Sequence, residues 1–220
     1  MTEIFFNGPA GRIEGRYHVS PKPDAPIALV LHPHPAYGGT MNNPVVKQIT
    51  QVFQQHEFSV LRFNFRGVGR SIGEFDNGIG ELSDAAAALD WLQQFNENAP
   101  QCWIAGFSFG AWISMQLLMR RPEISGFITI SPPANMYDFA FLAPCPASGT
   151  IIHGTNDQVV GQEPIEKLVQ KLSAQKNIVV DYTRIKGANH FYDKHLDQLS
   201  DHVSNYLSEQ MQVVEAAKSA

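Results

Sequence analysis

Short apolar runs alternate with segments of helical periodicity along most of this sequence. Residues 27–31 (IALVL) are continuously apolar, which is typical of a strand covered on both faces. Similar reasoning predicts strands at residues 58–65, 102–106, 126–130, 150–154 and 178–185. The intervening helices begin near Asn43-Pro44, Leu82, Ala111, Ile165 and Leu196. This alternation predicts an α/β fold in one domain, residues 1–220, with a mostly parallel central sheet and helices on both faces.

Composition and charge exclude several classes of protein. The 220 residues are 44% apolar and 17% charged, as in a folded chain with a substantial core. The net charge is -5 and no basic run occurs, so nucleic acid is not an expected partner. No apolar stretch approaches the roughly 20 residues that cross a bilayer, and no secretory signal is recognisable. Cys102 and Cys145 show no C-x-x-C spacing, so we expect reduced thiols and a cytoplasmic location.

Residues 106–110 (GFSFG) lie between a predicted strand and a predicted helix. This is the G-x-S-x-G pattern, whose glycines leave room for a very tight turn around the serine. Such a turn holds Ser108 Oγ above the carboxyl ends of the strands, where the chemistry of parallel sheets gathers. It also places the Phe109 N–H at a helix N-terminus, where it can bind a developing negative charge. We therefore interpret Ser108 as a nucleophile rather than as part of an ordinary glycine-rich turn.

A serine nucleophile needs a base that is oriented by an acid. Asp157 follows the strand predicted at residues 150–154, and an ordinary Asx turn is the alternative interpretation. His190 follows the last predicted strand, and a surface histidine is the alternative there. The order Ser108, Asp157, His190 is the order required when each partner follows a later strand of such a sheet. Among other carboxylates, Asp76 and Asp84 come too early in the chain, and Asp181 lies inside a strand.

The segments GFSFG, HGTNDQVV and KGANHFY, in that order, resemble the alpha/beta-hydrolase fold. LHPHPAYGGTMNN, LRFNFRGVGRSIGEFD, GELSDAAAALDWL and GFSFGAWISMQLLMRRP further resemble small bacterial serine hydrolases or esterases without a cap, which are related to dienelactone-hydrolase-like and peptidase-like branches. The similarity extends from about Phe6 to Leu207. It implies that Ser108 is the nucleophile, Asp157 the acid and His190 the base, with no metal or organic cofactor.

Residues 31–39 (LHPHPAYGG) follow the first central strand and are expected to face the nucleophile turn. In this fold that loop supplies the second donor of the oxyanion hole. Pro33 and Pro35 have no N–H, so the His34 amide is the nearest donor beyond His32 and the predicted partner of the Phe109 amide. A metal site would need a further protein ligand, and no such cluster stands out. A phosphate cradle would need a P-loop ending, which is missing.

Two further segments leave alternatives open. The glycine-rich segment 65–75 carries Arg66 and Arg70, and we expect it to brace the nucleophile turn, with the binding of an anionic substrate as the alternative. Residues 131–149 form a short, proline-rich connection in place of a cap, which predicts an open and shallow cleft. Either an apolar wall of that cleft or a packed loop is expected from Met136, Tyr137, Phe139 and Phe141.

Together these features predict a serine hydrolase that cleaves a small-molecule carboxylic ester, or a similarly activated acyl compound, through an acyl-enzyme intermediate. A peptidase or an acyltransferase using the same triad is the alternative within the fold. A non-catalytic member that only binds a ligand is the alternative from another class. Neither nucleic acid nor membrane insertion is expected, a homo-oligomer stays open, and the sequence does not indicate the natural substrate.

Overall fold

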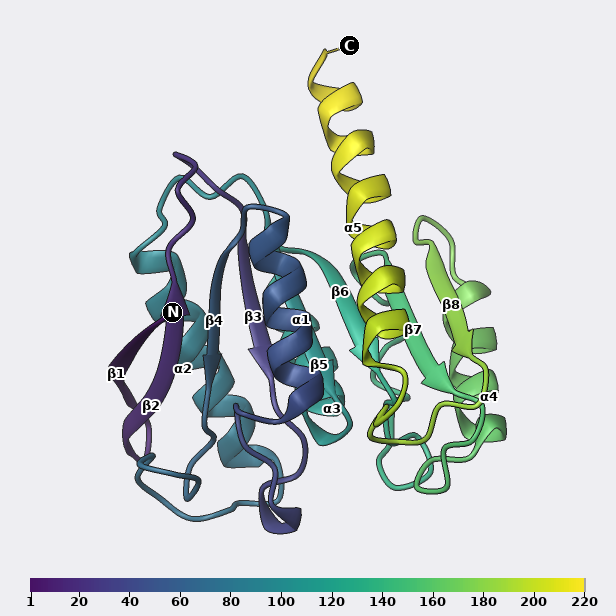
Figure 1. Cartoon of the computed structure of the whole chain (residues 1–220), viewed down its shortest axis with the longest axis horizontal. Helices are drawn as coiled ribbons and strands as arrows, with labels where there is room; N and C mark the ends of the chain where they lie inside the picture. Colours follow the sequence, from purple (N-terminus) through teal and green to yellow (C-terminus); the bar gives the residue numbers. More distant parts are fainter. Residues whose placement is uncertain (220) are drawn as a thin grey trace.

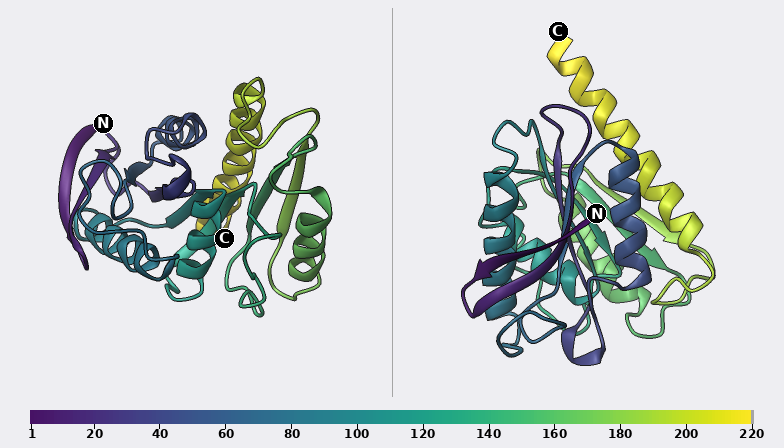
Figure 2. Two further views of the ribbon diagram at one scale, coloured as in Figure 1. Left: turned by 90° about the horizontal axis from the view of Figure 1, so that it is seen from below. Right: turned by 60° about the vertical axis from the view of Figure 1, so that its left-hand side comes forward.

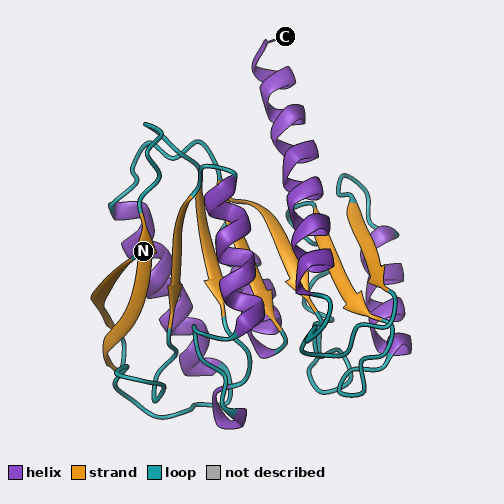
Figure 3. Ribbon diagram, in the orientation of Figure 1, coloured by secondary structure: helices purple, strands orange, loops and turns teal. Residues whose placement is uncertain are grey.

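An eight-stranded sheet forms the centre of the molecule (Figures 1 and 3). The computed structural model describes the backbone of residues 1–219 and the side chains of residues 1–213. The strand order is β1-β2-β4-β3-β5-β6-β7-β8, and every pair from β4 to β8 is parallel. The strands are β1 Thr2–Gly8, β2 Gly11–His18, β3 Ile27–Leu31, β4 Ser59–Phe63, β5 Cys102–Phe107, β6 Ile124–Ile130, β7 Gly149–Gly154 and β8 Val180–Ile185. The predicted α/β class with a mostly parallel sheet is confirmed.

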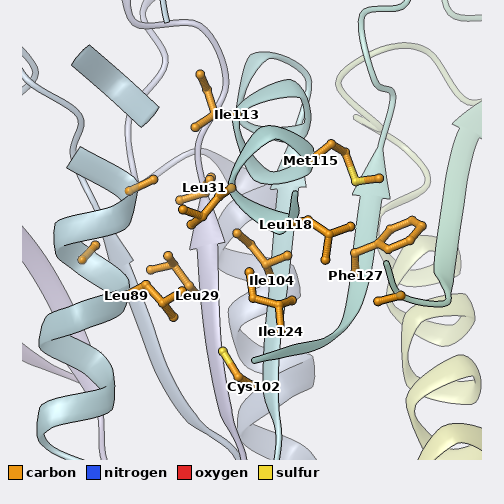
Figure 4. Packing of buried hydrophobic residues seen from close by; sticks show 14 of the residues in the cluster. Leu29, Leu31, Leu89, Cys102, Ile104, Ile113, Met115, Leu118, Ile124 and Phe127 are labelled. Carbon is orange, nitrogen blue, oxygen red and sulfur yellow. The ribbon is translucent and has the colours of Figure 1, made fainter. Parts of the chain in front are cut away.

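Helices cover both faces of the sheet, as predicted (Figure 2). They are α1 Pro44–Gln55, α2 Ile79–Gln94, α3 Phe109–Leu118, α4 Gln162–Ser173 and α5 Leu196–Ser219. Successive side chains of β3 point to opposite faces, so Leu29 and Leu31 belong to the core covered by α2, α3 and α4, whereas Ala28 and Val30 belong to the core covered by α1 and α5. Figure 4 shows the first of these two cores. Both faces of β3 are therefore buried, which explains its continuously apolar sequence.

The N-terminal hairpin was not predicted from the sequence. β1 and β2 pair antiparallel, and β2 also pairs antiparallel with β4, so the hairpin forms one edge of the sheet. Most side chains of β1 stay partly or fully exposed. An edge strand with one open face needs no continuous apolar run, and it therefore lacks the signal that marks β3.

The loops that follow the parallel strands gather at the carboxyl ends of the strands, to which the arrowheads point in Figure 3. Residues 131–148, between β6 and β7, contain no helix or strand, so the described chain has no cap over the carboxyl ends of the strands. Within residues 1–219, none of the helices combines the length and apolar character needed to cross a membrane.

Candidate active site

The turn between β5 and α3 holds Ser108 in a strained backbone conformation. Its φ is 54° and its ψ is -119°, values that a non-glycine residue rarely adopts. A Cβ at Gly106 would overlap the carbonyl oxygen of Gly110. A Cβ at Gly110 would lie 2.5 Å from the carbonyl oxygens of both Leu31 and His32. The turn therefore requires glycine at both positions, for two different neighbours.

Ser108, His190 and Asp157 come together in one chain of hydrogen bonds. His190 Nε2 lies 3.1 Å from Ser108 Oγ, and His190 Nδ1 lies 2.7 Å from Asp157 Oδ2. Because a carboxylate only accepts, the hydrogen of a neutral His190 belongs on Nδ1, which leaves Nε2 free to accept from the serine hydroxyl. The structure thus places all three predicted side chains in mutual contact, although they lie on loops far apart in sequence.

Asp157 is held as an anion by donors on both of its oxygens. Oδ1 accepts hydrogen bonds from the N–H groups of Val159 at 2.9 Å and Val160 at 2.8 Å. Burial alone would raise the pKa of Asp157, but hydrogen bonds from His153, His190 and the Val160 N–H outweigh it and hold this pKa well below its usual range. The carboxylate is therefore negatively charged wherever the imidazole of His190 can act as a base.

The amides of His34 and Phe109 are both unengaged. Phe109 is the first residue of α3, and His34 precedes a short 3-10 helix, Pro35–Tyr37. Neither N–H donates a hydrogen bond to another group within residues 1–219. The His34 carbonyl accepts from Tyr37 at 3.2 Å and Gly39 at 3.0 Å, which closes the loop. The contact of Gly110 with the Leu31 and His32 carbonyls brings this loop against the turn at Ser108.

The two imidazoles of the loop have different surroundings. His32 is fully buried, with Nδ1 2.6 Å from the Pro33 carbonyl oxygen and Nε2 accepting from the Phe65 N–H at 3.0 Å. Burial lowers the pKa of His32 to about 3, so this ring is a neutral brace between the ends of β3 and β4. The His34 ring accepts from the Ala36 N–H at 3.1 Å and packs against Phe109. No group of three potential metal ligands occurs among the described residues.

Ser108 opens into a cleft of about 380 Å³. Met136 and Tyr137 line it, as one of the two interpretations of segment 131–149 required. Phe139 and Phe141 do not line it, and their rings stack on each other with centroids 6.0 Å apart. Among the described residues no Asp, Glu, Lys or Arg lines the cleft, whose other walls are Pro33, His34, Tyr37, Gly38, Gly39, Asn43, Phe109, Pro133, Val159, His190 and Phe191.

The arginines of segment 65–75 bind carboxylates of the protein itself. The fully buried Asp84 accepts from Arg66 through the backbone N–H at 3.0 Å, Nε at 2.9 Å and Nη2 at 2.8 Å. Arg70 pairs with Glu3 and Glu14. Neither arginine lines the cleft. These ion pairs tie segment 65–75 to α2 and to the N-terminal hairpin rather than to the turn at Ser108, and they give no support to the alternative of an anionic-substrate site.

Two buried side chains near Ser108, His190 and Asp157 were not predicted from the sequence. His153, at the end of β7, lies 3.4 Å from Asp157 Oδ2 through Nε2. Tyr192 is fully buried, and its hydroxyl lies 3.0 Å from Ser131 Oγ. The available signal was a histidine inside an otherwise apolar strand, four residues before the predicted acid.

Comparison with known proteins places the chain in a family. A family model described as "Serine aminopeptidase, S33" matches residues 36–147. An uncharacterized protein of Rickettsia prowazekii is 56% identical over 211 residues, which cover 94% of this chain and 89% of the relative. This chain is an alpha/beta hydrolase of the family that the model describes. A crystal structure from Agrobacterium tumefaciens, described as a protein of unknown function and a candidate alpha/beta hydrolase, matches this hydrolase with 55% identity and a TM-score of 0.94, covering 96% of this chain and 97% of the other.

A more distant relative agrees with the open architecture of this hydrolase. It comes from Xanthomonas campestris and is described as a serine hydrolase without a lid. It is 29% identical, with a TM-score of 0.85, and the match covers 95% of this chain and 94% of that one. The expected membership of the alpha/beta hydrolases is therefore confirmed.

Proposed function

We propose that this hydrolase cleaves carboxylic esters, or similarly activated acyl compounds, with Ser108 as nucleophile, His190 as base and Asp157 as acid. The observation that carries the proposal is the unbroken chain of hydrogen bonds from Asp157 Oδ2 through both ring nitrogens of His190 to Ser108 Oγ. The serine end of this chain opens into the cleft, and the aspartate end is buried.

Each atom of this chain has a defined part in the reaction. Ser108 Oγ attacks the acyl carbon while His190 Nε2 takes its proton, and Asp157 stabilises the imidazolium that forms. The negative charge on the acyl oxygen is stabilised by the amides of His34 and Phe109, which have no other acceptor within residues 1–219. The imidazolium then gives its proton to the leaving alcohol. Water attacks the acyl-enzyme by the same proton path in reverse and releases the acid.

The lining of the cleft favours esters with uncharged groups over aminopeptidase substrates. An aminopeptidase must bind the α-ammonium group of its substrate, and a desolvated ammonium needs a carboxylate or several acceptors beside it. None of the described side chains that line this cleft carries a carboxylate. Proline, methionine, valine and aromatic side chains supply most of the surface instead. Apolar acyl and alcohol groups therefore fit this site better than an amino-terminal residue.

Labelling and a substrate panel test the proposal. A fluorophosphonate probe should label Ser108, and Ser108→Ala should abolish labelling and reduce ester cleavage by about 10⁴-fold or more. The panel contains p-nitrophenyl esters of increasing acyl length beside aminoacyl p-nitroanilides. We expect turnover of the esters with little turnover of the amides. A folded wild type that is neither labelled nor active would refute catalysis, and faster cleavage of the amides would replace the esterase with a peptidase.

A further inference from the structure

His153 occupies a position where packing alone favours an apolar side chain. It lies in β7 directly after Ile151 and Ile152, and none of its surface is exposed. Its Nδ1 has no hydrogen-bond partner among the described residues. A buried polar atom without a partner is destabilising, and a leucine or phenylalanine would avoid that cost. The contacts of its other ring nitrogen, Nε2, must therefore account for a histidine at this position.

The other nitrogen of His153 contacts the turn that presents Asp157. Nε2 lies 2.9 Å from the carbonyl oxygen of Val160 and 3.4 Å from Asp157 Oδ2. A carbonyl oxygen only accepts, so Nε2 carries the hydrogen and Nδ1 is the bare nitrogen. The Val160 N–H in turn donates to Asp157 Oδ1 at 2.8 Å. His153 therefore reaches the carboxylate both directly and through the Val160 peptide.

We propose that His153 is a positioning residue of the triad. It fixes the Val160 peptide and shares its Nε2–H between the Val160 carbonyl and Asp157 Oδ2. Part of the negative charge of this oxygen is thereby stabilised by His153 before it accepts a hydrogen bond from His190. The proposal rests on the function proposed above for Ser108, His190 and Asp157. In this arrangement two imidazoles approach the same oxygen from different elements, His190 at 2.7 Å and His153 at 3.4 Å. The longer contact moderates the attraction of the shorter one.

This arrangement has a consequence for the pH dependence of His190. The titratable groups around Asp157 are His153, His190 and Tyr192, and among the described residues no lysine, arginine or second carboxylate pairs with them. The Tyr192 hydroxyl is occupied by Ser131. Deleting the His153 donor leaves Oδ2 with His190 as its one side-chain donor, so the carboxylate holds the imidazolium more tightly. His190 then keeps its proton to a higher pH.

Three substitutions at one position separate a positioning role from a merely structural one. His153→Phe and His153→Leu delete the donor, and the leucine variant provides a second case if phenylalanine does not fit. His153→Gln retains an N–H group that can reach the same acceptors. Tyr192→Phe is the matched control, because it removes another buried polar group beside the triad and leaves the hydrogen bonds of Asp157 intact. Thermal unfolding establishes that each variant is folded.

The first readout is the pH profile of kcat/KM on a p-nitrophenyl ester, whose acid limb reports the free base. We expect this limb to move up by roughly 1 pH unit in the two donor-deleted variants, which corresponds to the low end for a hydrogen bond to a charged group. His153→Gln should move less, and Tyr192→Phe should not move. If the wild type cleaves the ester and the acid limb stays at its wild-type position in both donor-deleted variants, His153 does not position the triad.

The second readout is the NMR titration of the His190 imidazole without substrate. It should shift in the same direction and order as the acid limb. If the wild type cleaves no ester but this titration still shifts in the donor-deleted variants, the proposed function fails and the positioning role stands. If the wild type is active and the titration does not shift, the positioning role alone fails.

Discussion

Replacing His34 with proline removes one backbone N–H from the cleft, together with the imidazole ring. The φ of His34 is -55°, which a proline ring can adopt, and its ψ is 122°, which suits a residue before another proline. The His34 N–H donates to no acceptor within residues 1–219, so its loss breaks no backbone hydrogen bond, and the one hydrogen bond lost with the ring is that from the Ala36 N–H. Compared with His34→Ala, which loses the same ring, His34→Pro therefore differs by the deletion of a single predicted oxyanion donor.

The size of the effect follows from what one such donor contributes. Removing an oxyanion donor typically slows turnover by about 10² to 10³, which corresponds to about 2.7 to 4 kcal/mol of transition-state stabilisation. His34→Ala is the matched control, because it removes the same imidazole and keeps the amide. The ring accepts one hydrogen bond, from the exposed Ala36 N–H, so its loss should cost at most about tenfold.

The assay is steady-state hydrolysis of a p-nitrophenyl ester, with kcat and KM measured separately and thermal unfolding as the test of folding. We expect His34→Pro to lower kcat and to change KM little, because the donor acts on charge that develops in the transition state. If folded His34→Pro keeps more than about a tenth of the wild-type kcat, the amide is not an oxyanion donor. If alanine is as damaging as proline, the imidazole has the larger part.

Two other substitutions test the braces around the site. Asp84→Ala should lower the free energy of unfolding by about 3 to 5 kcal/mol in urea titrations, because it leaves the Arg66 guanidinium without its buried partner; Asp201→Ala, at an exposed position of α5, should change it by less than about 0.5 kcal/mol. Burial lowers the pKa of His32 to about 3, so below about pH 6.5 the unfolded chain binds a proton that the folded chain does not. The free energy of unfolding should therefore fall by roughly 2 to 3 kcal/mol between pH 7 and pH 4.5, and His32→Gln should show a smaller fall.

The parts of the fold that depend on neighbours in sequence could be predicted. Asn43 accepts from the Val45 N–H and Pro44 begins α1, as the Asn-Pro pair indicated. The strained turn at Ser108 has a local cause as well, because its geometry demands the flanking glycines. The exposed hairpin at the N-terminus has no comparable signal, since neither of its strands is buried on both faces.

The parts of the site that depend on contacts across the fold could not be predicted. In the segment 131–149, Met136 and Phe139 have similar side chains, and only the path of the loop decides which of them faces the cleft. Likewise, His153 looks like one residue of an apolar strand until the turn after Asp157 brings the Val160 carbonyl back onto it. A pattern within one segment carries no information about which groups a second segment places beside it.

The turn at Ser108 and the loop after β3 act as one structural unit, because their backbones pack directly on each other. β3 and β5 pair in parallel, with Leu31 opposite Gly106. The backbone of Gly110 then packs directly on the Leu31 and His32 carbonyls, where no side chain fits. His32 in turn holds the end of β4 through the Phe65 N–H. The strained Ser108 is thus supported by backbone packing on the same loop that presents the His34 amide, so a change that relaxes the serine turn also displaces its predicted oxyanion donor.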